Sequence, residues 1–239
     1  MSRSIADVPV MILAGGLATR MRPVTETIPK ALIDVAGEPF IDHQLRLLHQ
    51  QGVRQVVMCI GYLGEMIIDH AGDGARYGLS IQYSFDGPKL LGTGGALRQA
   101  AHLVGDEFFI LYGDSYLTCD DQRVLDDFHR QQKLAMMTVL RNENQWDKSN
   151  VIFEAGQLKL YDKRHPSPAM RYVDYGLSVM TRTALLRIPE QTACDLADLC
   201  CELSREGELA GHEVYDRFYE CGSPSGLAEL TEFIQRRAA

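Results

Sequence analysis

The stretch VMILAGGLATRMRP at residues 10–23 joins a short apolar run to two adjacent glycines and two arginines. Residues 10–13 have the length and composition of a buried strand, and Gly15-Gly16 begin the loop that ends it. Without a Cβ, these glycines let backbone N–H groups approach a phosphate chain closely. Together with Lys30 the arginines place three positive charges within eleven residues. The stretch therefore predicts a strand and an anion-binding loop, although it has neither the GK[ST] of a P-loop nor a GxGxxG pattern.

Short apolar strands alternate with helical patterns through the first half of the chain. We predict strands at 10–13, 56–60, 79–85 and 107–112, and helices at 41–51, 65–70 and 94–104. This order implies right-handed βαβ units, in whose sheets ligands bind beyond the carboxyl ends of the strands. Gly15-Gly16 and Gly113-Asp114 lie at two such ends. The predicted fold class is α/β, a three-layer Rossmann-like sandwich with a mostly parallel mixed sheet.

The second half of the sequence is less regular. We predict strands at 135–141, 157–161 and 175–181, a helix at 195–205, and a helix cap at Asp120-Asp121. No internal repeat or low-complexity linker interrupts the chain. We therefore predict a single domain over residues 1–239.

The composition excludes several classes of protein. Of 239 residues, 46% are hydrophobic and 23% charged, which is ordinary for a globular protein and unlike a disordered one. The net charge of −8 disfavours binding of nucleic acid or of an anionic membrane, but it allows a local cationic pocket. The apolar run 10–14 is too short for a secretory signal or a membrane span. The six cysteines contain no CxxC pair, so we expect reduced thiols and a cytoplasmic protein.

Residues 13–41 resemble the opening of the sugar-1-phosphate nucleotidyltransferases, whose pattern reads approximately LAGGxGTRLxPLTxxxPKPLxxVxGxPxI. About thirty positions match in order, with Ala18 where the family usually has Gly. The similarity continues through 92–96 and 112–114 and weakens over the last hundred residues. The small heptose-1-phosphate guanylyltransferases and the sugar-phosphate uridylyltransferases are the most similar types. The resemblance implies a nucleotide-binding half at about 8–120 and a sugar-phosphate-binding half at about 121–239.

The resemblance also implies roles for individual residues. The nucleotide would be bound by Leu13, Ala14, Gly15, Gly16, Thr19, Gly92, Thr93 and Gly94. The catalytic residues would be Arg20 and Lys30, which face the triphosphate, and Asp114, which is also the first Mg²⁺ ligand. Because Mg²⁺ takes few carboxylates together with phosphate oxygens and waters, one or two acidic residues suffice.

The second metal ligand of the family lies in a WxDxGTP segment, which residues 218–224 resemble as FYECGSP. Glu220 stands in the place of the aspartate, and its longer side chain requires a small retreat of the backbone. Lys163 matches the lysine that contacts the sugar phosphate, in a degenerate form of the family's E-K-P. Asp174 and Gly176 match an N-x-G stretch that binds sugar hydroxyls.

The implied reaction is attack of a sugar-1-phosphate oxygen on the α-phosphorus of an NTP, with release of pyrophosphate. Because the nucleophile is already an anion, positioning and electrostatics replace a general base. The seven histidines show no triad or HExxH arrangement. The implied cofactor is Mg²⁺, and the implied partners are an NTP and a sugar 1-phosphate, without nucleic acid or membrane. GTP with a heptose- or mannose-like 1-phosphate is the preferred pair, and uridylyl, thymidylyl and cytidylyl transfer stay open.

Two other functions are compatible with parts of the sequence. A catalytically silent nucleotide-sugar-binding regulatory subunit would explain Glu220 and the degenerate segment around Lys163, but not the retained Arg20, Lys30 and Asp114. A nucleotide-sugar-dependent glycosyltransferase would be expected to carry a DxD motif, whereas residues 113–116 read GDSY. The sequence leaves the sugar, the base and the oligomeric state, a homo-oligomer included, undecided.

Overall fold

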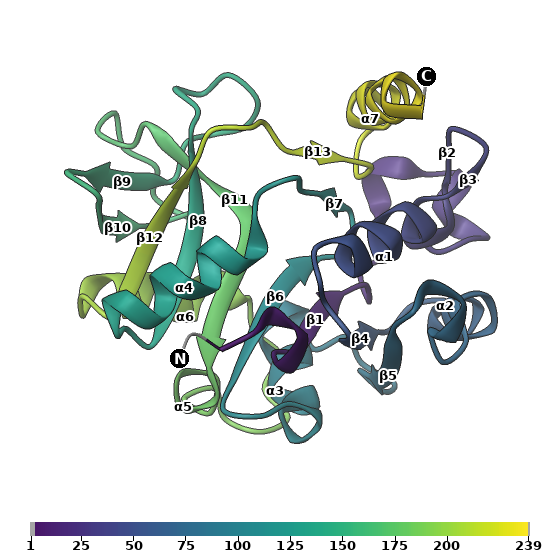
Figure 1. Ribbon diagram of the computed structural model, residues 1–239, viewed down its shortest axis with the longest axis horizontal. Helices are drawn as coiled ribbons and strands as arrows, with labels where there is room; N and C mark the ends of the chain where they lie inside the picture. Colours follow the sequence, from purple (N-terminus) through teal and green to yellow (C-terminus); the bar gives the residue numbers. More distant parts are fainter. Residues whose placement is uncertain (1–2, 239) are drawn as a thin grey trace.

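The computed structural model describes residues 3–238, which are organised around a nine-stranded sheet (Figure 1). Its strands are β1 (Val10–Leu13), β4 (Gln55–Ile60), β5 (Ser80–Phe85), β6 (Glu107–Tyr112), β8 (Ala135–Arg141), β9 (Val151–Glu154), β10 (Gln157–Tyr161), β11 (Tyr172–Thr181) and β12 (Leu209–Val214). Seven of them follow the order β10-β9-β11-β6-β1-β4-β5, and β8 pairs with both β11 and β12. Two small pairs lie outside this sheet, β2 (Asp34–Val35) with β3 (Glu38–Pro39) and β7 (Ser115–Tyr116) with β13 (Tyr219–Glu220).

The sheet is parallel among the strands from the first half of the chain and mixed among the strands that follow. Strand β1 pairs in parallel with β4 and β6, and β4 in parallel with β5. Strand β11 then runs antiparallel to both β6 and β8, while β12 is parallel to β8. The parallel pairs bring the carboxyl ends of β1, β4, β5 and β6 to one edge of the sheet. The predicted α/β class with a mixed sheet is confirmed.

Helices cover both faces of the sheet. They are α1 (Phe40–Gln50), α2 (Gly64–Ala71), α3 (Gly92–Ala100), α4 (Asp121–Gln131), α5 (Arg182–Leu185), α6 (Leu196–Arg205) and α7 (Pro224–Ala238). Side chains of α1, α2 and α4 enter one hydrophobic core, and those of α3, α5 and α6 enter the other. Helix α7 lies at the top of the view beside β2 and β3 (Figure 1) and covers a third, smaller core. The three-layer arrangement follows from the sequence order of strands and helices.

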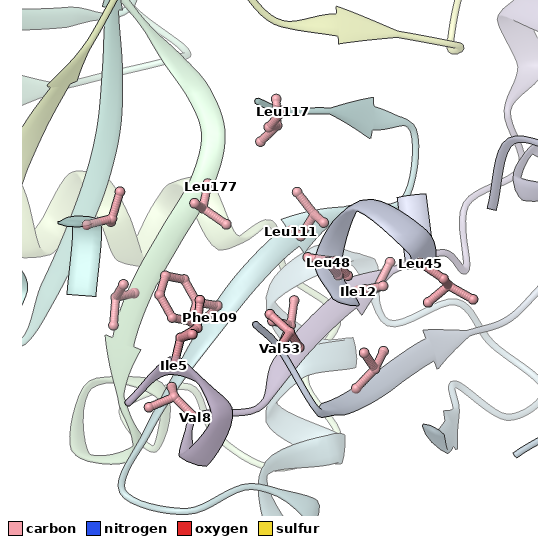
Figure 2. Close-up of a cluster of buried hydrophobic side chains, with 14 of the residues drawn as sticks. Ile5, Val8, Ile12, Leu45, Leu48, Val53, Phe109, Leu111, Leu117 and Leu177 are labelled. Carbon is pink, nitrogen blue, oxygen red and sulfur yellow. The ribbon is translucent and has the colours of Figure 1, made fainter. Parts of the chain in front are cut away.

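Alternation along β1 shows how one buried strand serves both cores. Val10 and Ile12 point into the core beneath α1, whereas Met11 points into the core beneath α3. Figure 2 shows Leu48 of α1 and Val53 gathered close to Ile12. Because both faces of such a strand are buried, its sequence is a continuous apolar run, as in residues 10–13. The burial of β1 on both sides fixes the position of the loop that follows it.

Several elements differ from the sequence prediction. The helix predicted at 94–104 begins at Gly92 and continues after α3 as a 3-10 turn, and β11 begins three residues before the predicted 175–181. Strands β7, β9, β12 and β13 and helix α7 were not predicted from the sequence. In β12, Gly211 interrupts the strand pattern because its missing side chain makes room for the ring of Phe153, which a Cβ would meet at 2.8 Å. Asp120 caps α4 as predicted, by accepting from Arg123 N at 3.1 Å.

None of the helices within residues 3–238 is both long and apolar enough to cross a membrane. All six cysteines are free thiols.

Candidate functional site

A cavity of about 230 Å³ lies at the carboxyl ends of β1, β4, β5 and β6. We call it the first cavity, and its lining comprises Leu13, Ala14, Gly15, Gly16, Lys30, Ala31, Cys59, Asp86, Leu90, Gly92, Thr93, Ala96, Tyr112, Gly113 and Asp114. Six of the eight residues predicted to bind a nucleotide are in this lining. The position agrees with the rule that parallel sheets bind ligands beyond their strand ends.

The backbone of the loop after β1 packs closely against the backbone at the ends of the neighbouring strands β4 and β6. Ala14 N donates to Cys59 O at 2.8 Å, and Gly113 N donates to Leu13 O at 3.0 Å, so the loop is tied to both neighbouring strands. A Cβ on Gly15 would lie only 3.1 Å from Gly61 N, and one on Gly61 would lie 2.8 Å from Gly15 O. The two loops therefore pack this closely because both positions are glycine.

A second cavity of about 350 Å³ adjoins the first and shares Tyr112 and Asp114 with it. Its lining comprises Arg20, Tyr112, Asp114, Ser115, Trp146, Asp147, Asn150, Tyr161, Lys163, Val173, Asp174, Tyr175, Gly176, Phe218, Glu220 and Ser223. Every residue that was predicted to bind the sugar phosphate lines this cavity, as do both predicted metal ligands. The structure thus brings together the residues to which the resemblance assigned the acceptor and the metal.

Asp114 and Lys30 form an ion pair where the two cavities meet. Lys30 Nζ donates to Asp114 Oδ2 at 2.6 Å, and both side chains are largely shielded from solvent, at 23% and 21% exposure. Asp114 is the second residue after β6, and Lys30 begins the 3-10 turn Lys30–Leu32. A short charge-assisted hydrogen bond of this kind fixes the direction of the carboxylate.

Glu220 reaches the same junction from the other end of the chain. Strand β13 pairs with β7 so that Glu220 lies opposite Ser115, and Cys221 N donates to Asp114 O at 3.0 Å. The Glu220 carboxylate accepts from Ser223 Oγ at 2.5 Å and from the N–H of Gly222. The side chain is therefore held in place before any ligand binds.

Gly222 marks the point on which the charged groups converge. A Cβ built on Gly222 would lie 2.8 Å from Asp114 Oδ2, 2.9 Å from Glu220 Oε2 and 3.5 Å from Arg20 Nη2. The two carboxylate oxygens are therefore less than about 6 Å apart across a space that only a glycine leaves open. Two hard oxygen donors beside an open cleft fit Mg²⁺, which keeps water and phosphate oxygens as its remaining ligands. Within residues 3–238 no third His, Cys, Asp or Glu joins them.

Arg20 extends over this junction as a cation without a protein partner. It lies in the 3-10 turn Thr19–Met21, and within the described part of the chain it makes no hydrogen bond or ion pair. Its guanidinium faces the point where the two carboxylates meet. An unpaired guanidinium lining a cavity is suited to bidentate binding of a phosphate group.

Asp174 is directed into the second cavity by an irregularity in β11. The pairing register between β11 and β8 shifts between Asp174 and Ser178, and Gly176 has a φ of +106°. Asp174 Oδ1 accepts from Gly176 N at 3.0 Å, while Asp174 N donates to Asn150 Oδ1 at 3.0 Å. Burial raises the pKa of Asp174 to about 6, against the lowering effects of the Gly176 N–H and of Lys163. Asp174 thus offers hydrogen-bond acceptors to hydroxyl groups in the cavity.

Lys163 and Thr93 are linked through Asp195, the N-cap of α6. Lys163 is exposed and its Nζ lies 3.9 Å from Asp195 Oδ2, which leaves its ammonium available to a ligand in the second cavity. Thr93 Oγ1 donates to Asp195 Oδ1 at 2.8 Å and accepts from Leu196 N at 2.8 Å. Thr93 therefore anchors α6 to the wall of the first cavity.

Two predicted residues lie outside both linings. Thr19 is exposed at the start of its 3-10 turn. Gly94 packs against the segment before α6, where a Cβ would lie 2.8 Å from Cys194 Sγ. The prediction missed Cys59, Asp86 and Leu90 in the first cavity, and Trp146, Asp147 and Asn150 in the second. Asp86 follows β5 directly, so the strand-end rule that selected Asp114 applies to it as well.

The chain belongs to the nucleotidyl transferase family, whose profile matches residues 9–235. It is 44% identical over 108 residues to N-acetylmuramate alpha-1-phosphate uridylyltransferase from Neisseria meningitidis serogroup B, a match that covers 45% of this chain and 47% of the relative. It is 28% identical over 234 residues to mannose-1-phosphate guanylyltransferase catalytic subunit beta from Xenopus tropicalis, covering 94% of this chain and 64% of the relative. The matches thus span less than two thirds of these relatives' lengths.

The fold is shared with a solved structure of HddC from Yersinia pseudotuberculosis in complex with GMP-PN. The two superpose with a TM-score of 0.78 at 20% sequence identity, over 95% of this chain and 99% of HddC. At this level of identity the similarity shows the fold alone.

Proposed function

We propose that this protein transfers a nucleoside monophosphate from an NTP to a sugar 1-phosphate, giving an NDP-sugar and pyrophosphate. The observation that carries the proposal is the junction of the two cavities, where Asp114, Glu220 and Arg20 converge on one point beside Lys30. The first cavity would hold the nucleotide and the second the sugar phosphate, so that the two reacting phosphates meet at this junction. The names of the relatives, all transferases, support turnover over a silent regulatory subunit.

The proposed reaction is an in-line displacement at phosphorus. An oxygen of the sugar 1-phosphate forms a bond to the α-phosphorus, and the bond between that phosphorus and the bridging oxygen breaks, so that pyrophosphate leaves with the electron pair. Repulsion between the two polyanions is the principal barrier. Lys30 would offset it on the triphosphate side, Arg20 at the junction where the two phosphates meet, and Lys163 on the sugar-phosphate side.

The metal would be held by Asp114 and Glu220. Bound there, Mg²⁺ supplies charge neutralisation for the phosphate oxygens. Lys30 and Ser223 hold the two carboxylates through hydrogen bonds in the absence of substrates. Among residues 3–238, no histidine lines either cavity. That fits a nucleophile that is ionised at neutral pH and needs no general base.

For the substrates, we propose GTP and a heptose- or mannose-like 1-phosphate. The mannose-1-phosphate guanylyltransferase among the relatives supports this pair, and the uridylyltransferase supports UTP as the alternative base. In the second cavity Asp147 and Asp174 suit the hydroxyls of a neutral sugar, because carboxylates accept hydrogen bonds and repel a second acidic group. The free thiols agree with a cytoplasmic location.

The test is pyrophosphate release in the presence of Mg²⁺, with each of the four NTPs against a panel of neutral sugar 1-phosphates. We expect turnover with one pair and a new NDP-sugar detectable by mass spectrometry. The Asp114→Asn variant should release pyrophosphate on the order of 100- to 1000-fold more slowly under the same conditions. Absence of pyrophosphate release across the whole panel would contradict the proposal.

A further inference from the structure

The single tryptophan of the chain, Trp146, lies in the wall of the second cavity. It belongs to the loop between β8 and β9, which projects from the sheet beside the connection from β12 to β13 (Figure 1). Its side chain is 38% exposed, although a tryptophan is normally well buried. None of the proposed phosphate or metal contacts involves it. The proposed reaction therefore leaves the exposure of this ring unexplained.

The loop that carries Trp146 is rigidly built. Asn142 is 2% exposed, and its amide donates to Asp147 O at 2.6 Å and to Ser149 Oγ at 3.1 Å. The carbonyl oxygen of that amide accepts from Trp146 N at 3.1 Å. Asn144 N donates to Ser149 Oγ at 3.0 Å, and Ser149 N donates to Asn144 Oδ1 at 2.9 Å. Buried hydrogen bonds on both sides of Trp146 fix the backbone from which its ring projects.

Arg217 supports the indole ring from the side of β13. Its guanidinium carbon lies 5.4 Å from the ring centroid of Trp146 and 4.8 Å from that of Tyr219, within the range of cation–π attraction. Arg217 Nη2 in turn pairs with Glu229 of α7 at 2.5 Å. The ring thus packs against Arg217 next to the strand that carries Glu220, and the residue stays partly exposed and lines the second cavity.

The lining of the second cavity includes both polar and apolar side chains. Asp174 and Asn150 offer hydrogen-bonding groups, whereas Trp146 offers an apolar surface. A pyranose has the matching division, because its hydroxyls project outward while its ring carries patches of C–H groups. Binding sites for small molecules combine apolar and aromatic walls with a few placed polar groups in this way.

Resting on the proposed function, we propose that Trp146 is the platform against which the apolar C–H face of the acceptor sugar packs. Asp174 and Asn150 hold the hydroxyls, and Trp146 selects a neutral sugar ring with an unobstructed apolar face. Trp146 then determines affinity for the sugar and not for the nucleotide, since it lines the second cavity and not the first.

The first test uses Trp146 as its own reporter, because no other tryptophan contributes to the emission. The ligands are titrated in two matched pairs, GDP-mannose with GDP and UDP-glucose with UDP. Within each pair the nucleotide absorbs equally, so any difference in emission comes from the sugar. Calorimetry establishes that each ligand binds. For the pair whose NTP and sugar 1-phosphate turn over, we expect the NDP-sugar to shift or quench the emission and the nucleoside diphosphate to leave it unchanged. Equal emission with both bound ligands would overturn the proposal while leaving nucleotidyl transfer intact.

The second test separates affinity for the two substrates. Trp146→Ala should raise KM for the sugar 1-phosphate about tenfold and leave KM for the NTP unchanged, whereas Trp146→Phe should retain most of the affinity. Tyr215→Ala is the matched control, since Tyr215 is 83% exposed and lines neither cavity. An unchanged KM for the sugar 1-phosphate in Trp146→Ala would exclude a platform role. Absence of turnover in the wild-type panel would instead remove the proposed function itself.

Discussion

Replacing Gly222 with alanine adds one methyl group at the point where the charged side chains converge. The backbone of Gly222 is outside the left-handed region, so alanine introduces no backbone strain. The new Cβ would lie 2.8 Å from Asp114 Oδ2 and 2.9 Å from Glu220 Oε2, whereas ordinary contact begins at 3.4 Å. Each carboxylate must therefore retreat by about half an ångström. The methyl group thus acts on the proposed metal ligands with little effect on the rest of the fold.

The expected size of the effect follows from this displacement. A misplacement of about 1 Å costs on the order of 100-fold in rate, so two carboxylates displaced by about half that distance should lower kcat about 10- to 100-fold. In free energy of activation this corresponds to about 1.4–2.7 kcal/mol. Binding of the NTP through the loop after β1 should be affected far less, because the nearest atoms to the added Cβ belong to Asp114, Glu220 and Arg20 and not to Gly15 or Gly16.

The assay is steady-state pyrophosphate release at saturating substrates, with thermal unfolding measured in parallel. Gly105→Ala is the matched control, because its added Cβ would meet nothing within 4 Å and its φ is not positive. We expect Tm of both variants within about 4 °C of the wild type. A Gly222→Ala enzyme with full kcat would refute the inference that Asp114 and Glu220 act together at this point.

Four further predictions test the remaining charges. Arg20→Ala and Asp114→Asn should each lower kcat on the order of 100- to 1000-fold in the pyrophosphate assay, as removal of one preorganised charge does. Lys163→Ala should raise KM for the sugar 1-phosphate about tenfold at unchanged KM for the NTP, whereas Lys159→Ala, which lines neither cavity, should change neither. The pKa of Asp174 rises from 3.8 to about 6 on folding. Its burial therefore lowers the free energy of unfolding, and this loss grows as the pH rises from 3.8 to about 6. Chemical denaturation should accordingly show Asp174→Asn stabilised by up to about 3 kcal/mol at pH 8 and by almost nothing near pH 4. EDTA should abolish pyrophosphate release until Mg²⁺ is restored, with Tm changed by less than about 2 °C, because protein donors already hold both carboxylates.

The parallel half of the fold was predictable because its signals are local. Strand β1 is apolar on both faces, so its four residues stand out as a run, and Gly15-Gly16 ends it with the residues that a close turn requires. Asp114 follows from the same rule, since Gly113-Asp114 comes directly after an apolar strand. In both places the chemistry lies where secondary structure ends, and the sequence pattern shows that boundary.

The rest of the site depends on contacts between distant segments. The resemblance predicts that Gly94 lines the base and ribose of the nucleotide, yet the space beside it is filled by Cys194, a packing that no local pattern reveals. Trp146 is placed by the buried amide of Asn142 within an irregular loop that has no periodicity. The pairing of β13 with β7, which brings Glu220 to Asp114, joins residues about a hundred positions apart. Only the family resemblance indicated that these two carboxylates act together.

The common wall of the two cavities, Tyr112 and Asp114, has a consequence for how such proteins diversify. Under the proposed function, substitutions in the loop after β8 would alter the cavity for the acceptor and leave the lining of the first cavity unchanged. Substitutions of Tyr112 or Asp114 would alter both cavities together. For a protein engineer, residues 145–148 are therefore the segment to randomise, whereas Asn142, Ser149 and the end of β6 should be kept.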